Sequence, residues 1–165
     1  MNGISNAACS ALVITTPNAA PTHFDFYNGD YVRDCLSASG DVGFEVQLGD
    51  RLLTGNVEFA AEGTPTKGTG HLTMTNDWGY SLTGAVTCFN RIDAKTAVFS
   101  GTITDATKYA IPGYFIAKVV DNGSAGDKIV VFVNEHGNAD CSDPSDGSDG
   151  SDILADVTSG NLVVH

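Results

Sequence analysis

The residue types that most often carry chemistry occur in this chain without a spacing that defines a reaction. No serine lies in a G-x-S-x-G sequence; the stretch N-G-S-A-G at 122–126 lacks the first glycine and is typical of a hairpin turn. The four histidines, at positions 23, 71, 136 and 165, show neither H-E-x-x-H nor H-x-H spacing. We expect no catalytic serine, and a histidine site only if folding brings His71 and His136 together.

Carboxylates are the next candidates, because glycoside hydrolysis needs two of them about 5–9 Å apart across a cleft. The chain has only four glutamates, Glu45, Glu58, Glu62 and Glu135, and nothing in their surroundings selects a pair. The sequence therefore predicts that the protein is not an enzyme.

Aspartates could instead bind calcium, a hard cation that prefers several oxygen ligands. Four of them recur at every third position, Asp143, Asp146, Asp149 and Asp152, whereas an EF-hand loop places acids at every second position and closes with Glu. A shorter oxygen cluster combines Asp121 and Asp127 with Asn122. The favoured interpretation is a solvated acidic loop, with no cofactor. Weak Ca²⁺ binding at either cluster is the alternative.

Aromatic rings could bind sugars. Trp78 and Tyr80 lie in N-D-W-G-Y, a predicted turn, where flat rings can stack on the apolar faces of sugars. The favoured interpretation is a ring folded over the end of the domain as a plug, and ligand stacking is the alternative.

Four cysteines, Cys9, Cys35, Cys88 and Cys141, are scattered with no C-x-x-C pair, which disfavours zinc. We expect structural disulfides, hence a secreted, extracellular protein, with free core thiols as the alternative. The start of the chain lacks a basic and apolar leader, so we expect a mature chain; a cytosolic protein would leave the cysteines unexplained.

Composition excludes two classes of partner. A formal net charge of −12 would repel the phosphates of nucleic acid and anionic lipid surfaces. No apolar run is long enough for a membrane helix, so we expect no membrane insertion. Abundant Gly and Asp, with 16 Asp against 4 Glu, favour strands and tight turns over helices.

The candidate side chains must therefore be positioned mainly by β-strands and the turns between them. Alternation of Phe44, Val46 and Leu48 with polar residues indicates a strand with one buried face. The predicted strands are 42–48, 52–60, 70–75, 80–89, 95–104, 114–121, 128–134 and 161–165, with 23–27 as a further half-buried strand. We predict an all-β fold, an antiparallel β-sandwich of about 8–10 strands stabilised by disulfides, with a β-barrel as the alternative.

Prolines divide the chain near its start. Residues 1–22 contain a β-branched run at 12–16 followed by Pro17 and Pro21, and form either an N-terminal arm or a first strand. Residues 23–165 form a single domain, in which 140–152 is a flexible acidic loop.

Several short motifs follow one another along this domain. They are G-H-L-T-M-T at 70–75, G-A-V-T-C-F at 84–89, V-F-S-G-T-I-T at 98–104, V-V-D-N-G at 119–123, Asp140-Cys141 and the closing strand at 160–164. In this order they resemble a group of uncharacterised secreted bacterial domains, frequent in actinobacteria. The resemblance covers roughly residues 42–165. It implies a secreted β-sandwich-like domain and a pairing of Cys88 with Cys141, which leaves Cys9 for Cys35.

These observations favour a non-catalytic extracellular structural or adhesive module. Copies of the same chain are the candidate partner, assembling through the N-terminal strand; pairing of that strand within its own domain is the competing interpretation. The alternative function is a carbohydrate- or calcium-binding domain.

Overall fold

The computed structural model describes residues 36–108, 113–134, 140–141 and 154–165. Within them lie eight β-strands and one short 3₁₀ turn: β1 (Ser37–Leu48), β2 (Arg51–Thr64), β3 (Lys67–Asn76), β4 (Ser81–Arg91), β5 (Thr96–Thr107), β6 (Tyr114–Val120), η2 (Gly123–Ala125), β7 (Lys128–Asn134) and β8 (Ala155–Val164). The predicted all-β fold is confirmed, and each predicted strand from 42 onward overlaps an observed one. The predicted strands at 12–16 and 23–27 lie outside the described residues.

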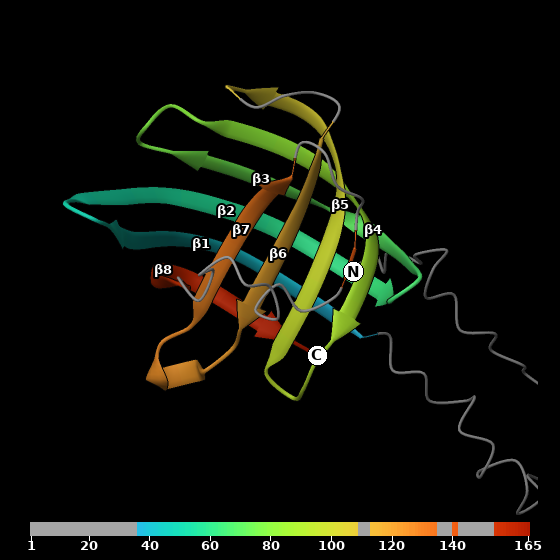
Figure 1. The fold of residues 1–165 in the computed structure, drawn as a ribbon. Helices are drawn as coiled ribbons and strands as arrows, with labels where there is room; N and C mark the ends of the chain where they lie inside the picture. The colour runs from blue at the N-terminus through green and yellow to red at the C-terminus, as the bar shows by residue number, and fades with distance from the viewer. Residues whose placement is uncertain (1–35, 109–112, 135–139, 142–153) are drawn as a thin grey trace, which may run out of the picture.

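The strands pair in chain order, all antiparallel, and β8 returns to pair with β1, so the sheet closes into a barrel. In Figure 1 the barrel is flattened, with β5, β6 and β7 crossing in front of β1, β2 and β3. Two facing layers of this kind account for the sandwich-like strand pattern, while the closed ring is the predicted barrel alternative. No helix in the described ranges is long and apolar enough to cross a membrane.

Ring closure is uneven. β1 pairs with β2 along its whole length, from Ser37 opposite Glu62 to Leu48 opposite Arg51. In the described residues, the pairing of β7 with β8 consists of only two residue pairs, Lys128 with Asp156 and Ile129 with Ala155.

Phenylalanine rings lie over glycines of the neighbouring strand at three places inside the barrel. Directly opposed pairs are Phe59 with Gly40, Phe44 with Gly55, and Phe115 with Gly101. A Cβ added to Gly40 would lie 2.7 Å from Phe59 Cε1, so the ring occupies the space that a side chain would need. Cross-strand pairs of this kind fix which residues face each other.

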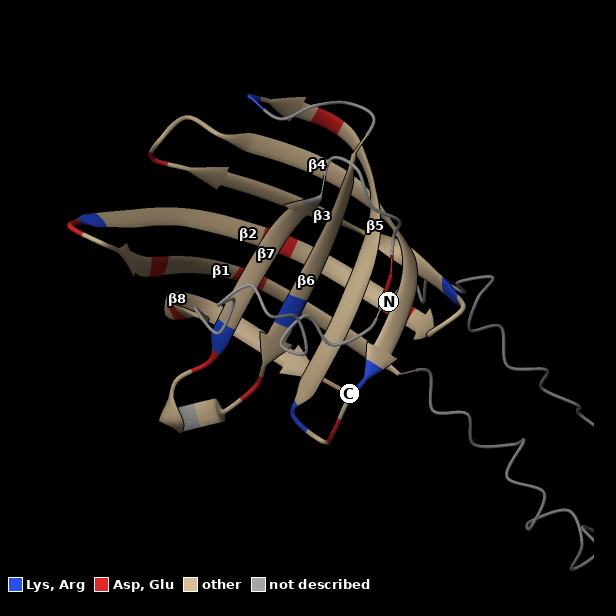
Figure 2. Cartoon of the chain, in the orientation of Figure 1, with Lys and Arg blue, Asp and Glu red and all other residues tan. Residues whose placement is uncertain are grey.

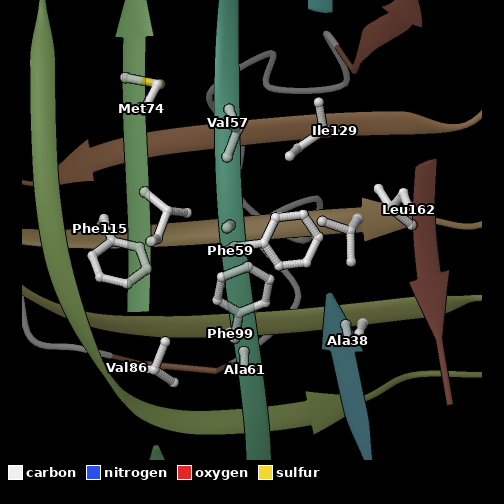
Figure 3. Packing of buried hydrophobic residues seen from close by; sticks show 14 of the residues in the cluster. Ala38, Val57, Phe59, Ala61, Met74, Val86, Phe99, Phe115, Ile129 and Leu162 are labelled. Atoms are coloured by element: carbon white, nitrogen blue, oxygen red, sulfur yellow. The ribbon is translucent and has the colours of Figure 1, made fainter. Parts of the chain in front are cut away.

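The aromatic rings join the two layers of the flattened barrel (Figure 3). Phe59 of β2 stacks on Phe99 of β5, with ring centroids 5.1 Å apart and planes at 25°. Phe99 meets Phe115 of β6 edge to face, with centroids 6.4 Å apart. All three side chains are buried. The core therefore depends on contacts between strands far apart in sequence.

A second buried region lies outside the barrel wall. Phe99 points into the core, so its neighbours Val98 and Ser100 face outward, yet both are fully buried. Cys88 lies opposite Ser100 on β4 and is joined by a disulfide to buried Cys141. Asn90 Nδ2 donates a hydrogen bond of 3.1 Å to the Cys141 carbonyl. The connection from β7 to β8 is thus anchored on the outer side of β4 and β5, and the predicted Cys88–Cys141 pairing is confirmed.

The disulfide is expected to contribute strongly to stability. It joins residues 53 apart, and in the chain-entropy model a loop of that length is worth about 4 kcal/mol. The double variant Cys88→Ala/Cys141→Ala should lose most of that free energy of unfolding, measured by urea denaturation. A Cys9→Ala/Cys35→Ala variant is the control that keeps this disulfide. An unchanged midpoint in the first variant would contradict the expectation.

Gly40 is expected to tolerate no side chain. Gly40→Ala should lower the free energy of unfolding by about 1–3 kcal/mol, because the buried Phe59 ring would have to move within a packed core. Ser39→Ala is the matched control, since Ser39 is exposed and its substitution should change stability by less than about 0.5 kcal/mol. Equal thermal midpoints for the two variants would show that the pair is not tightly packed.

An aspartate closes the turn between β4 and β5. Asp93 Oδ1 accepts hydrogen bonds from the backbone N–H groups of Lys95, at 2.7 Å, and Thr96, at 2.9 Å. The Lys95 N–H is the main cause that holds the Asp93 pKa below its usual value, with further contributions from Thr96 and Arg91.

A lowered folded-state pKa stabilises the protein above the unfolded pKa of about 3.9, and the stabilisation is lost as pH falls through the folded value. Asp93→Asn keeps the oxygen acceptor and removes the charge. The wild type should therefore lose stability more steeply than this variant between about pH 5 and pH 3, followed by thermal unfolding. Asp50→Asn, at an exposed turn where the carboxylate has no bond to the described residues, should behave like the wild type.

Candidate functional site

An open hollow of about 420 Å³ is lined by residues of β8, β1, β2 and β3 and of the turn after β3. Its walls combine hydroxyl, amide and carboxylate groups with two glycines and one ring. The lining residues are Gly43, Phe44, Thr54, Gly55, Asn56, Thr75, Asn76, Asp77, Thr158 and Ser159.

Four residues that line the hollow form a row across the sheet, and one of them is a glycine. Ser159, Gly43, Asn56 and Thr75 lie in one row across the four strands, each opposite the next. A Cβ added to Gly43 would lie 2.5 Å from Ser159 Oγ and 3.6 Å from Asn56 Oδ1. The Ser159 side chain thus occupies the space that a side chain at position 43 would need, and Gly43 itself is buried.

An irregularity in β8 adds a further hydroxyl. Gly43 lies opposite Ser159, but the next residue, Phe44, lies opposite Val157, so Thr158 is an extra residue on β8. Such bulges redirect side chains and occur often beside functional sites. Here the bulge places two consecutive hydroxyl residues beside Gly43.

Several polar groups of the hollow have no partner among the residues that the structure describes. Within the described part of the chain, the side chains of Asn56, Thr75, Thr158 and Ser159 make no hydrogen bond. All four are exposed. Their donors and acceptors are available to a ligand.

The turn between β3 and β4 forms one rim of the hollow. Asp77 is tied to β2, because the Thr54 N–H donates to Asp77 Oδ1 at 3.2 Å and the Asp77 N–H donates to the Thr54 carbonyl at 3.0 Å. Asn76 Oδ1 accepts from the backbone N–H groups of Trp78 and Tyr80, at 3.1 and 3.0 Å. These hydrogen bonds fix the backbone of the N-D-W-G-Y turn, including the backbone of Trp78.

The two predicted stacking residues differ in what covers them. Trp78 is 37% exposed, and both interpretations of its ring, as a plug and as a ligand platform, stay predictions. Lys108 Nζ donates to the Trp78 carbonyl at 2.7 Å and lies 5.1 Å from the centre of the Tyr80 ring. Tyr80 is half-buried, with a cation over its ring. Leu52, 49% exposed, lies two residues from Thr54 on the same face of β2 and adds an apolar side chain near the hollow.

The predicted calcium cluster around η2 is built as a turn. Asp127 Oδ1 accepts the Asn122 N–H at 2.9 Å. Asp121 Oδ1 accepts the Gly123 N–H at 3.2 Å, and Asp121 Oδ2 accepts the Val164 N–H at 3.3 Å. Both carboxylates thus hold backbone groups together, and calcium binding here stays a prediction.

Other predicted sites are only partly covered by the structure. Asp143, Asp146, Asp149 and Asp152 lie outside the described residues, as do Cys9, Cys35 and His136. His71 Nε2 lies 3.9 Å from Glu58 Oε1 on the neighbouring strand. No group of three or more His, Cys, Asp or Glu that could hold a metal occurs in the described ranges.

Sequence reasoning did not identify the hollow. Two sequence patterns could have indicated it. One is a glycine at an outward position of a strand that otherwise alternates, in D-V-G-F-E at 41–45, and the other is the T-S-G run at 158–160. Trp78, the predicted stacking residue, follows the lining residues Asn76 and Asp77 in the same turn but does not itself line the hollow.

Compared with protein-family models, curated proteins and solved structures, the chain matches none. The family resemblance over residues 42–165 therefore stays a prediction, and any functional assignment has to come from the geometry of the site.

Proposed function

We propose that this domain is a non-catalytic, extracellular carbohydrate-binding module whose site is the hollow beside Trp78. The observation that supports it most is the row of hydroxyl and amide groups of Ser159, Asn56 and Thr75, which make no hydrogen bond with the described residues, in a hollow whose rim is the turn that carries the exposed Trp78. The Cys88–Cys141 disulfide is compatible with an extracellular location.

The chemistry of the hollow suits sugars. A sugar ring offers hydroxyl groups that both donate and accept, and Asn56, Thr75 and Ser159 supply matching groups. Its apolar face can pack on the indole of Trp78. Because three of these four side chains stand on paired strands, they are held in place before the ligand arrives, which reduces the entropy lost on binding.

The lining of the hollow favours binding over hydrolysis. Glycoside hydrolysis needs two carboxylates across a cleft, whereas the described lining contains one, Asp77, whose Oδ1 accepts the Thr54 N–H.

Self-assembly as a structural or adhesive module stays a prediction, because the N-terminal strand that would mediate it lies outside the described residues.

Fluorescence tests the proposal directly, since Trp78 is the only tryptophan of the chain. Titration with neutral, acidic and amino-sugar oligosaccharides should change its emission for at least one of them, and Asn56→Ala should weaken that binding by about threefold to tenfold. Trp78→Ala should weaken it by a similar factor in calorimetry, through the lost stacking.

Ile92→Ala is the matched control, because Ile92 is also a large exposed apolar residue (41%) but lies outside the hollow. A full panel of saccharides that neither alters the emission nor produces heat would overturn the proposal.

A further inference from the structure

We propose that Glu62 and Thr69 form a docking site on the outside of the barrel for the guanidinium group of Arg33, in the segment that precedes β1 of the same chain. This inference does not depend on the proposed sugar site. It assigns the side chains that tie the N-terminal segment to the folded domain.

Two buried oxygen atoms on neighbouring strands have no partner. Glu62 of β2 lies directly opposite Thr69 of β3. Both side chains point outward, because they alternate with positions on the core faces of their strands, such as Ala61 and Leu72. Glu62 Oε1 and Thr69 Oγ1 are nevertheless buried, and neither atom has a hydrogen bond to the described residues. A buried carboxylate oxygen without a donor costs free energy, so this pair of side chains needs a donor group.

The basic residues of the neighbouring strands do not supply that donor. In β1, β2, β3 and β8 the only Lys or Arg residues are Arg51 and Lys67, each at the first position of its strand (Figure 2). Arg51 lies eleven residues from Glu62 on β2, or about 36 Å. Lys67 lies two residues before Thr69 on the same face, and His165 lies in the same row of the sheet as Glu62. Both are exposed, and neither forms an ion pair with the described residues.

The chain enters the barrel beside this pair of side chains. The Leu36 carbonyl accepts the N–H of Gly63, the residue after Glu62, at 3.2 Å. Arg33 precedes Leu36 by three residues and is the only Lys or Arg among residues 1–35. Three residues of extended chain span at most about 11 Å. Arg33 is therefore the one strong cation of the N-terminal segment, and it is tethered within reach of Glu62.

A guanidinium group matches what the two side chains offer. Its planar fork carries five N–H donors, so one group can donate to the Glu62 carboxylate and to the Thr69 hydroxyl at the same time. Hydrogen bonds between charged groups are stronger than neutral ones, and burial from water strengthens them further. Such a contact would hold the N-terminal segment against the barrel near the point where β1 begins.

Docking at this place would leave the proposed sugar site open. Asn56, which lines the hollow, lies six residues before Glu62 on the same face of β2, about 20 Å away. The N-terminal segment would thus be held at the other end of the strand.

The experiment follows limited cleavage of the full chain by chymotrypsin after Tyr31, two residues before Arg33, with mass spectrometry to identify the product. Cleavage reports the fraction of molecules in which the segment is undocked. Glu62→Gln and Arg33→Gln should each raise the rate about tenfold. The double variant should be cleaved no faster than either single variant, because both changes remove the same contact. Thr69→Val should raise the rate by a smaller factor, about threefold.

Glu58→Gln is the matched control, because Glu58 is an exposed glutamate on the same face of β2, and its rate should equal that of the wild type. Thermal midpoints establish which variants are folded; if Glu62→Gln is not, Arg33→Gln and Thr69→Val with their double variant give the same comparison. Unchanged cleavage in the folded single variants, or rates that multiply in the double variant, would overturn the inference. Protection of the wild type that increases with protein concentration would show docking between two copies and would also overturn it.

Discussion

The contact on which the rest of this structure depends is a phenylalanine ring lying over a glycine of the adjacent strand. Phe59 over Gly40 and Phe115 over Gly101 let the rings lie flat against the barrel wall. In that position Phe59 can stack on Phe99, which in turn meets Phe115, so one line of rings joins β2 to β5 and β6. The flattened shape of the barrel follows, because the layers approach until the rings touch.

Two glycines of β1 serve opposite sides of the same wall. Gly40 faces inward and gives its space to a core ring, while Gly43 faces outward and gives its space to the Ser159 hydroxyl at the hollow. Strand alternation makes this possible, since residues three apart lie on opposite faces. The core contact also fixes the register of β1 against β2, and that register aligns Gly43 with Asn56. The proposed site is thus built on the same pairing that packs the core.

Much of the secondary structure was predictable from sequence, because alternation such as Phe44, Val46 and Leu48 is a local signal of period two. Ring closure was not, since β8 meets β1 only through contacts across more than a hundred residues. Likewise, Val98 and Ser100 are fully buried although they alternate with the core residue Phe99, and the Cys88–Cys141 disulfide joins residues 53 apart, so no local periodicity could reveal either feature. The hollow was missed because it depends on register, whereas Trp78 was identified because its turn motif is local.

The way β1 meets β8 determines how the domain would respond to mechanical load. Ser37 and His165 exchange backbone hydrogen bonds of 3.3 and 2.8 Å, so the first described strand and the last end side by side. A force that separates residues 37 and 165 would break the hydrogen bonds between β1 and β8 one after another, starting at this end of the two strands. Resistance to such peeling is set by single hydrogen bonds, whereas shearing two strands lengthwise would load the whole ladder together. A domain pulled through these two residues would therefore open at low force, and the Cys88–Cys141 disulfide would limit how far the chain could extend.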